Sequence, residues 1–442
     1  MSAAGWRRWM ALIILLALTA RLGAIFTLKR WDSATPGINR QLALGLLDNG
    51  SFTFREHGYF GPSSITTPPY PVVLAAIFRV FGPETPTAYF AALALNAIFG
   101  ALCAAVIAKL VQRLTQHATL AVVAGLLVAV WPPQIFAATF AQPMALATLC
   151  VATTCLFWVR SLQNHSLLPW IGFSLAAALA ALIEPPFLLV ILLAAGITPF
   201  IRNWPADVRV RNMAVLLLAC VLLLLPWIAR NHAVHQQWLM TTTFWERVWA
   251  GANPNATGSD RLRLTPERHA AAKLLIETDD SSDLVRAPMM QIDPLSPAQR
   301  SALRDLPEAQ RESLFRKWAS EWLTVHGGVW LGQLPARLIK VWWIDYDHPM
   351  SRNPLALIPR SLAALLGLVG LLTAFRARLP IGFLTLVFIA TLIFAGATVA
   401  SVKQMVLIEP LQIAIACAGV AAIVRTRANR AAASSKLAEA AA

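Results

Sequence analysis

Ten long apolar runs divide this chain, and they fix the kind of fold that it can adopt. A membrane-spanning helix needs about 20 mainly apolar residues, because hydrocarbon offers no hydrogen-bond partner to an exposed backbone group. Hydrophobic residues make up 57% of the sequence and charged residues 13%, against roughly 25% charged residues in soluble domains. The sequence therefore predicts an all-α polytopic membrane protein with about ten transmembrane helices, near residues 9–27, 87–110, 118–138, 142–159, 167–183, 186–201, 213–229, 354–374, 380–399 and 404–424.

The net charge of +15 is unevenly distributed along the chain. With a cytoplasmic N-terminus, the cytoplasmic segments carry fourteen Lys or Arg residues and two acids, whereas the far-side segment 231–352 carries fourteen of each. An excess of basic residues in cytoplasmic loops is the usual signature of membrane orientation. The charge therefore predicts cytoplasmic N- and C-termini and gives no reason to expect a nucleic-acid partner.

Two far-side segments, 28–86 and 231–352, are too long to be simple turns, and loops of that length are usually functional. The chain divides into a membrane module 1–230 containing the first loop 28–86, a loop domain 231–352, further spans in 353–425 and a tail 426–442. In the first loop, Gln41 to Leu47 and Tyr70 to Phe81 predict two short interfacial helices. Thr265 to Leu323 predicts several short soluble helices, and the tail after Arg430 a frayed end.

The sequence gives no sign of a disulfide framework, a metal site or a nucleotide-binding loop. All five cysteines lie inside apolar runs, where cysteine behaves as a small buried hydrophobe. The acidic stretch 279–283 lacks the terminal Glu of a calcium-binding loop. We therefore predict no cofactor and leave the question of a divalent metal open.

A junction near the middle of the chain combines a membrane span with a charged, irregular segment. Pro226-Trp227 and Arg230-Asn231 end the seventh apolar run, and a Gly- and Asn-rich stretch, 249–258, follows. Earlier, Pro68-Pro69-Tyr70-Pro71 precedes a short apolar helix. These motifs resemble those of the polyprenyl-phosphate-sugar-dependent membrane glycosyltransferases. That C-type fold group includes protein O-mannosyltransferases and the aminoarabinose transferase of lipid A, and the resemblance extends from Arg21 to about Ile423.

The resemblance implies transfer of a sugar from a polyprenyl-phosphate carrier to a lipid, glycan or protein acceptor. It implies a multi-pass protein of a bacterial inner membrane that also contacts membrane lipids, with the reaction on the periplasmic face. Cations or fixed donors should stabilise the departing lipid phosphate. The candidates for binding substrate are Arg230, Asn231, Arg247, Asn253, Tyr70, Arg337 and Lys340. Arg and Lys at span ends also commonly extend toward lipid headgroups.

Transfer also requires a carboxylate within hydrogen-bond reach of the acceptor. We predict Asp32 as this catalytic acid because it follows the first span at the expected interface, with Glu56 in reserve. The alternative is that Asp32 has no catalytic role and only balances the positive charges of Lys29 and Arg30 at the membrane surface. Asp345 and Asp347 form a second acidic pair, which shares one side of the chain in an extended segment but not in a helix.

Several positions depart from the pattern of the family. Asn39 occupies the position of a Tyr that follows the family's acid, Gln142 that of a Glu, and Glu184 precedes prolines where relatives carry Arg. Only Lys403 remains of an Arg-rich entry to the last span. Two alternatives follow: a noncatalytic relative that binds lipid-linked sugar in an envelope polysaccharide assembly complex, or a transporter or flippase.

Overall fold

The computed structural model describes residues 2–32, 37–56, 59–164, 166–201, 204–254, 256–259, 296–347, 351 and 353–441. Each of the ten predicted spans overlaps a helix, although the span predicted at 118–138 is broken after Ala129. The helices are α1 Ala3–Leu28, α4 Pro86–Thr115, α5 Ala118–Ala129, α7 Met144–Gln163, α8 Leu167–Ile183, α9 Phe187–Ile197, α10 Ala206–His235, α17 Pro354–Arg376, α18 Gly382–Ala397 and α19 Val402–Ala441. Among the described residues, six of these helices are long and apolar enough to cross a membrane: α1, α4, α7, α10, α17 and α19. The other four have 11 to 17 residues. The chain is a multi-pass membrane protein.

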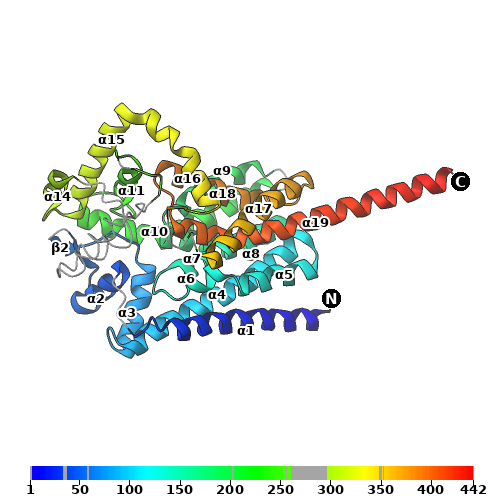
Figure 1. Ribbon diagram of the computed structural model, residues 1–442, viewed down its shortest axis with the longest axis horizontal. Helices are drawn as coiled ribbons and strands as arrows, with labels where there is room; N and C mark the ends of the chain where they lie inside the picture. The colour runs from blue at the N-terminus through cyan, green and yellow to red at the C-terminus, as the bar shows by residue number, and fades with distance from the viewer. Residues whose placement is uncertain are drawn as a thin grey trace.

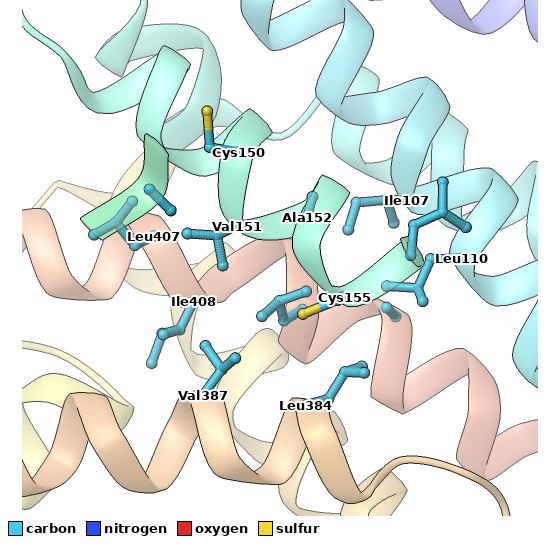
Figure 2. Packing of buried hydrophobic residues seen from close by; sticks show 14 of the residues in the cluster. Ile107, Leu110, Cys150, Val151, Ala152, Cys155, Leu384, Val387, Leu407 and Ile408 are labelled. Carbon is cyan, nitrogen blue, oxygen red and sulfur yellow. The ribbon is translucent and has the colours of Figure 1, made fainter. Parts of the chain in front are cut away.

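The centre of the bundle is a tightly packed core. Figure 2 shows Ile107 of α4, Cys155 of α7, Leu384 of α18 and Ile408 of α19 converging on one apolar cluster. Close helix approach also depends on small residues, as is common between membrane helices. A Cβ atom at Gly370 of α17 would lie 2.4 Å from a backbone carbonyl oxygen of α19, so these two helices are in direct backbone contact.

The first loop and the segment after α10 form a cap at one end of the bundle, here called the loop end (Figure 1). Both chain termini lie at the opposite end. The two helices predicted in the first loop are present as α2 Ile38–Asn49 and α3 Pro69–Phe81. Between them the structure adds an antiparallel hairpin, β1 Thr53–Glu56 and β2 Tyr59–Pro62, which was not predicted from the sequence. A short helix, α6 Pro132–Ala137, connects α5 to α7.

Residues 231–352 contribute α11 Phe244–Gly251, α14 Pro297–Leu303, α15 Glu308–Gly332 and α16 Leu334–Trp342. The short soluble helices predicted for Thr265 to Leu323 correspond in part to α14 and to the start of α15, while 265–295 lies outside the described residues. α15 bends at His326, whose backbone angles are not helical. Val325, beside the bend, is 75% exposed.

The tail differs from its prediction. We expected a frayed end after Arg430, but α19 continues as a helix to Ala441 and extends beyond the bundle (Figure 1). Alanine has the highest helix propensity of all residues, and the tail is rich in it. A helix that begins inside the bundle is also already nucleated, so each added residue extends it without a new initiation cost.

Candidate functional site

The predicted site residues gather at the loop end in three polar clusters. The junction cluster contains Arg230 and Asn231 with Ser63, Ser64 and Glu308. The α3 cluster surrounds Tyr70, and the α16 cluster contains Arg337 and Lys340. Each cluster joins segments that are distant in the sequence.

The junction cluster attaches the first loop to the end of α10. Nη1 of Arg230 donates to the Ser63 carbonyl at 2.9 Å and to Oγ of Ser64 at 2.7 Å, and Nη2 donates to the Phe52 carbonyl at 3.3 Å. The guanidinium also lies 5.1 Å from the centre of the Trp227 ring, within the range of a cation–π contact. Arg230 therefore fixes the loop in place, and it does so while half-buried.

Asn231 is fully buried next to Arg230. Its Oδ1 accepts a hydrogen bond from Oγ of Ser64 at 2.6 Å, and its Nδ2 donates to the Leu239 carbonyl at 3.0 Å. Nε2 of His235 lies 2.9 Å from the same Ser64 hydroxyl. Because that hydroxyl donates its single proton to Asn231, His235 must donate to it through Nε2–H. The Arg-Asn motif thus organises Ser64 on the first loop.

Glu308, the first residue of α15, belongs to this cluster although we did not predict it. Its Oε2 accepts hydrogen bonds from the Ser64 backbone N–H at 2.8 Å and from Oγ1 of Thr242 at 2.7 Å. In the sequence, an acid at the start of a helix is the ordinary partner of the helix dipole. Pro307 before Glu308 marks that helix start, but no local signal points to Ser64, 244 residues away.

The α3 cluster brings Tyr70 and Gln142 together through a residue of α4. Nδ2 of Asn96 donates to the Tyr70 hydroxyl at 3.1 Å, to the Phe140 carbonyl at 2.8 Å and to the Gln142 carbonyl at 3.4 Å. The Arg30 guanidinium lies 4.0 Å from the centre of the Phe140 ring. The segment that leaves α1 therefore also reaches this cluster.

Two predicted acids lie near the α3 cluster. Asp32 follows Arg30 at the end of α1 and is exposed, with its backbone N–H bonded to the Lys29 carbonyl at 3.2 Å. Glu184 follows α8 directly. Oγ1 of Thr67, at the entry to α3, donates to the Ile183 carbonyl beside it at 3.1 Å. Both acids thus lie close in the chain to residues that contact the α3 cluster, Arg30 and Ile183.

In the α16 cluster the cations are enclosed by the protein itself. Arg337 is fully buried and donates to the carbonyls of Gly251 at 2.5 Å and Gly396 at 2.9 Å. Burial lowers the pKa of its guanidinium to about 10, which leaves it charged at neutral pH. Lys340, also fully buried, donates to the Thr257 carbonyl at 2.7 Å and pairs with Asp347 at 2.5 Å. Both predicted phosphate ligands are therefore used to hold the Gly-rich segment.

The Gly-rich segment after α11 lies directly against α16. Gly258 has a φ of +80°, and a Cβ atom there would lie 3.0 Å from the Arg337 side chain, so glycine suits both the backbone and the packing. Asn253 is buried, and its Nδ2 donates to the Trp249 carbonyl at 2.8 Å. Asp345 is buried too, and accepts hydrogen bonds from the Ser259 hydroxyl and from the backbone N–H of Asp347. Asp345 and Asp347 therefore share one cluster.

Two further predicted site residues, Arg247 and Glu56, lie outside the three clusters. Arg247 lies on α11 and is half-buried, and among the described residues its guanidinium has no hydrogen bond or ion pair. Glu56 ends β1, and its side chain lies outside the described residues. Arg247 is thus a cation at the loop end whose donors have no partner in the part of the chain that the structure describes.

α15 also fixes α11 through an acid. Oε1 of Glu312 accepts a hydrogen bond from the Trp245 backbone N–H at 2.7 Å, in the first turn of α11. Burial raises the pKa of the Glu312 carboxyl to about 7, although the N–H groups of that turn oppose the shift. Glu312 therefore titrates close to neutral pH.

A buried ion pair lies between α17, α19 and α6. Nε of Arg360 and Oε1 of Glu409 are 2.9 Å apart, and Nε2 of Gln134 donates to Oε2 of Glu409 at 3.4 Å. The two charged residues are only 5% and 2% exposed. Across the described part of the chain, no group of three or more His, Cys, Asp or Glu residues is arranged to hold a metal ion.

Comparison with known proteins was made at the level of sequence and of structure. No protein-family profile matches the chain, and no curated protein sequence matches it. Solved structures do match. An oligosaccharyltransferase from Archaeoglobus fulgidus in the apo form aligns with 99% of this chain and 52% of its own, at 14% identity and a TM-score of 0.57.

The chain has the fold of that oligosaccharyltransferase. A second structure from the same organism, the oligosaccharyltransferase AglB with an inhibitory peptide and a dolichol-phosphate, gives 12% identity and a TM-score of 0.53 over 97% of this chain and 52% of its own. The predicted C-type fold of polytopic membrane glycosyltransferases is thereby confirmed. The chain spans about half the length of both oligosaccharyltransferases.

A shorter protein also aligns. ArnT from Cupriavidus metallidurans, bound to undecaprenyl phosphate, aligns with 96% of this chain and 79% of its own at 15% identity. Its TM-score of 0.39 is too low to support an inference about fold.

Proposed function

We propose that this protein is a membrane glycosyltransferase that moves a sugar from a polyprenyl-phosphate carrier to an acceptor at the loop end. The observation that carries the proposal is the junction cluster, in which the Pro-Trp-x-x-Arg-Asn motif at the end of α10 organises the first loop and an acid of α15. This cluster lies on a fold shared with oligosaccharyltransferases. In the proposed orientation, the loop end faces the periplasm and both termini face the cytoplasm of a bacterial cell.

The cations divide into two groups by their contacts. Arg337 and Lys340 are enclosed: Nη1 and Nη2 of Arg337 donate to carbonyl groups, and Nζ of Lys340 bonds to the Thr257 carbonyl and to Asp347, so we assign both residues to positioning the Gly-rich segment. Arg247 has no such partner among the described residues, and we propose it as a ligand of the departing phosphate. Arg is suited to this role because its planar fork engages phosphate through two hydrogen bonds.

Asp32 is the proposed group that takes the acceptor's proton. Its exposure at the loop end, beside the α3 cluster, supports the assignment. A positioned general base contributes about 10²- to 10⁴-fold to a rate. Arg230 has the further role of holding Ser63 and Ser64, so its removal would disturb the cluster as well as any contact with substrate.

The test is transfer by the purified protein in lipid nanodiscs, with radiolabelled polyprenyl-phosphate sugars and a mixture of lipid, glycan and peptide acceptors. Asp32→Asn should lower transfer by about 10²-fold or more, and Arg247→Ala should weaken use of the donor. Lys317→Ala, which removes an exposed cation 66% accessible on α15, is the matched control and should leave transfer unchanged.

Three outcomes would contradict the proposal. Transfer that neither substitution affects would remove the site assignment. Specific donor binding without transfer to any acceptor would favour the noncatalytic relative. Movement of labelled donor across sealed vesicles, with no sugar transferred, would favour the transporter.

A further inference from the structure

A cavity of about 330 Å³ opens at the loop end where three distant segments meet. Tyr59 and Pro62 of β2 form one side, His235 and Gln236 at the end of α10 another, and the first turns of α15 the third. It adjoins the junction cluster, since His235 and Glu308 belong to both. Ligand sites typically have volumes of about 300–1,000 Å³, so this one suits a single small molecule or sugar unit.

Glu308 is the chemically distinctive residue of the cavity. Its side chain is buried, with the residue only 4% exposed, yet it lines the cavity. Oε2 has two donors, the Ser64 N–H and the Thr242 hydroxyl. Oε1 has no hydrogen bond within the described part of the chain, and the Arg230 guanidinium of the same cluster interacts with the carboxylate through its charge. Because Glu308 lines the cavity, a ligand donor in the cavity can bond to Oε1.

The rest of the lining narrows the chemistry of that ligand. Among the described residues, no Lys or Arg lines the cavity. An anion would therefore meet the Glu308 carboxylate with no Lys or Arg in the lining, and only Arg230 behind it offsets that charge, so the lining favours a neutral ligand over the phosphate end of a lipid carrier. Gln236 and Gln310 contribute amides that both donate and accept hydrogen bonds. This lining suits a neutral molecule with several hydroxyl groups.

An aromatic ring completes the site. The Tyr59 ring lies over Gly61, where an added Cβ atom would be 2.3 Å from its hydroxyl oxygen and 2.7 Å from a ring carbon. Residues 59 and 61 face the same side of β2, because side chains alternate along a strand. Glycine at 61 thus leaves room for the Tyr59 ring, which lines the cavity and can contact the apolar face of a sugar.

We propose that this cavity binds a neutral saccharide, one of whose hydroxyl groups donates a hydrogen bond to Oε1 of Glu308. One part of this proposal rests on the proposed function: the bound saccharide is the acceptor, or the terminal sugar of a larger acceptor, and the phosphate of the donor binds elsewhere. As a binding site, the cavity is independent of whether transfer occurs.

The first test measures binding of free sugars to the full-length protein in nanodiscs by saturation-transfer NMR. The probes are methyl glucoside, N-acetylglucosamine and, as the anionic counterpart, glucuronic acid. We expect the neutral sugars to bind and glucuronic acid to bind at least about tenfold more weakly, because it meets the Glu308 charge.

Two variants locate and explain the binding. Ala309→Trp fills the cavity and should abolish the neutral-sugar signal, whereas the same change at exposed Ala302 of α14 should not. Glu308→Gln keeps the shape but removes the charge, so it should lower neutral-sugar affinity and admit glucuronic acid. A purely structural role of Glu308 would not produce that gain.

Absence of neutral-sugar binding by the wild type, or binding that persists in Ala309→Trp, would overturn the proposal, as would equal binding of glucuronic acid by the wild type. The transfer assay, run on the same preparations, separates the two proposals. If Ala309→Trp still transfers sugar, the proposed function is kept but this cavity is not the acceptor site. Sugar binding that Ala309→Trp abolishes, in a protein that transfers from no donor, leaves the site standing without the function.

Discussion

Breaking the ion pair between Arg360 and Glu409 is expected to destabilise the bundle much more than removing both charges. The perturbations are Arg360→Met, Glu409→Leu and the double substitution. Either single change leaves one charge within the helices with no opposite charge beside it. Both side chains are almost fully buried, and Gln134 supplies a further side-chain hydrogen bond to Glu409.

The expected magnitudes follow from this burial. Removing one partner of a buried ion pair costs about 3–5 kcal/mol, because the remaining charge is desolvated and uncompensated, whereas replacing both by apolar residues is often neutral or stabilising. The double variant should therefore be more stable than either single variant. An exposed pair gives the contrast: Lys317 and Glu321 are 4.0 Å apart with side chains 66% and 61% exposed, and Lys317→Ala should cost no more than about 1 kcal/mol.

Melting of the purified protein can be followed with a thiol-reactive dye, because the five cysteines are free and four of them are buried. Both single variants should melt several degrees below the wild type, and the double variant near it. Single-variant losses that simply add in the double variant, within about 0.5 kcal/mol, would show that the two charges are not coupled and would refute the reasoning.

Three further predictions rest on single positions. The raised pKa of Glu312 means that the folded protein holds a proton which the unfolded chain releases near pH 4.5. This stabilisation of about 3 kcal/mol is complete below that pH and is lost as the pH rises through about 7. Melting temperature should thus fall between pH 5 and 8 in the wild type and much less in Glu312→Gln, and parallel curves would contradict the assignment. Gly370→Leu should lower stability by about 3 kcal/mol, since its Cβ meets the backbone of α19, while Gly23→Leu, where no atom lies within 4 Å, should be neutral in the same melting assay. Gly61→Ala should displace the Tyr59 ring and weaken neutral-sugar binding about tenfold, or 1.4 kcal/mol, and unchanged NMR signals would show that the ring does not contact the sugar.

The sequence was sufficient for the helical framework because each span carries its own evidence. A run such as 213–229 is apolar over its whole length, and hydrocarbon permits it little besides a helix. The interfacial helix α3 was also predictable from the sequence, since Pro68 and Pro69 mark its start. The hairpin 53–62 was missed because its second half, with Gly61 and Pro62, is typical of turns. Phe54 of its first strand packs against Leu42 and Ile65, which lie outside the hairpin, and no local pattern predicts that contact.

The site was predictable only where a motif was local. Arg230 and Asn231 adjoin each other at a span end, and both lie in the junction cluster. Glu308 was not found, because an acid after a proline at a helix start has an ordinary explanation, and its partner Ser64 lies 244 residues earlier. Conversely, Lys340 was predicted to bind substrate, because no local sequence pattern predicts that its ammonium group bonds to Thr257 and Asp347.

The contacts of Arg337 bear on the order in which the protein can be assembled during synthesis. Chains fold progressively as they are made, and the carbonyl of Gly396 that receives this guanidinium comes 59 residues later, at the end of α18. Until that helix has been inserted, a buried cation lacks one of its partners, and the Gly-rich segment beside it lacks its support. Synthesis must therefore have passed α18 before the loop end can acquire its final form, and a chain that ended earlier would leave the Arg337 guanidinium without this carbonyl.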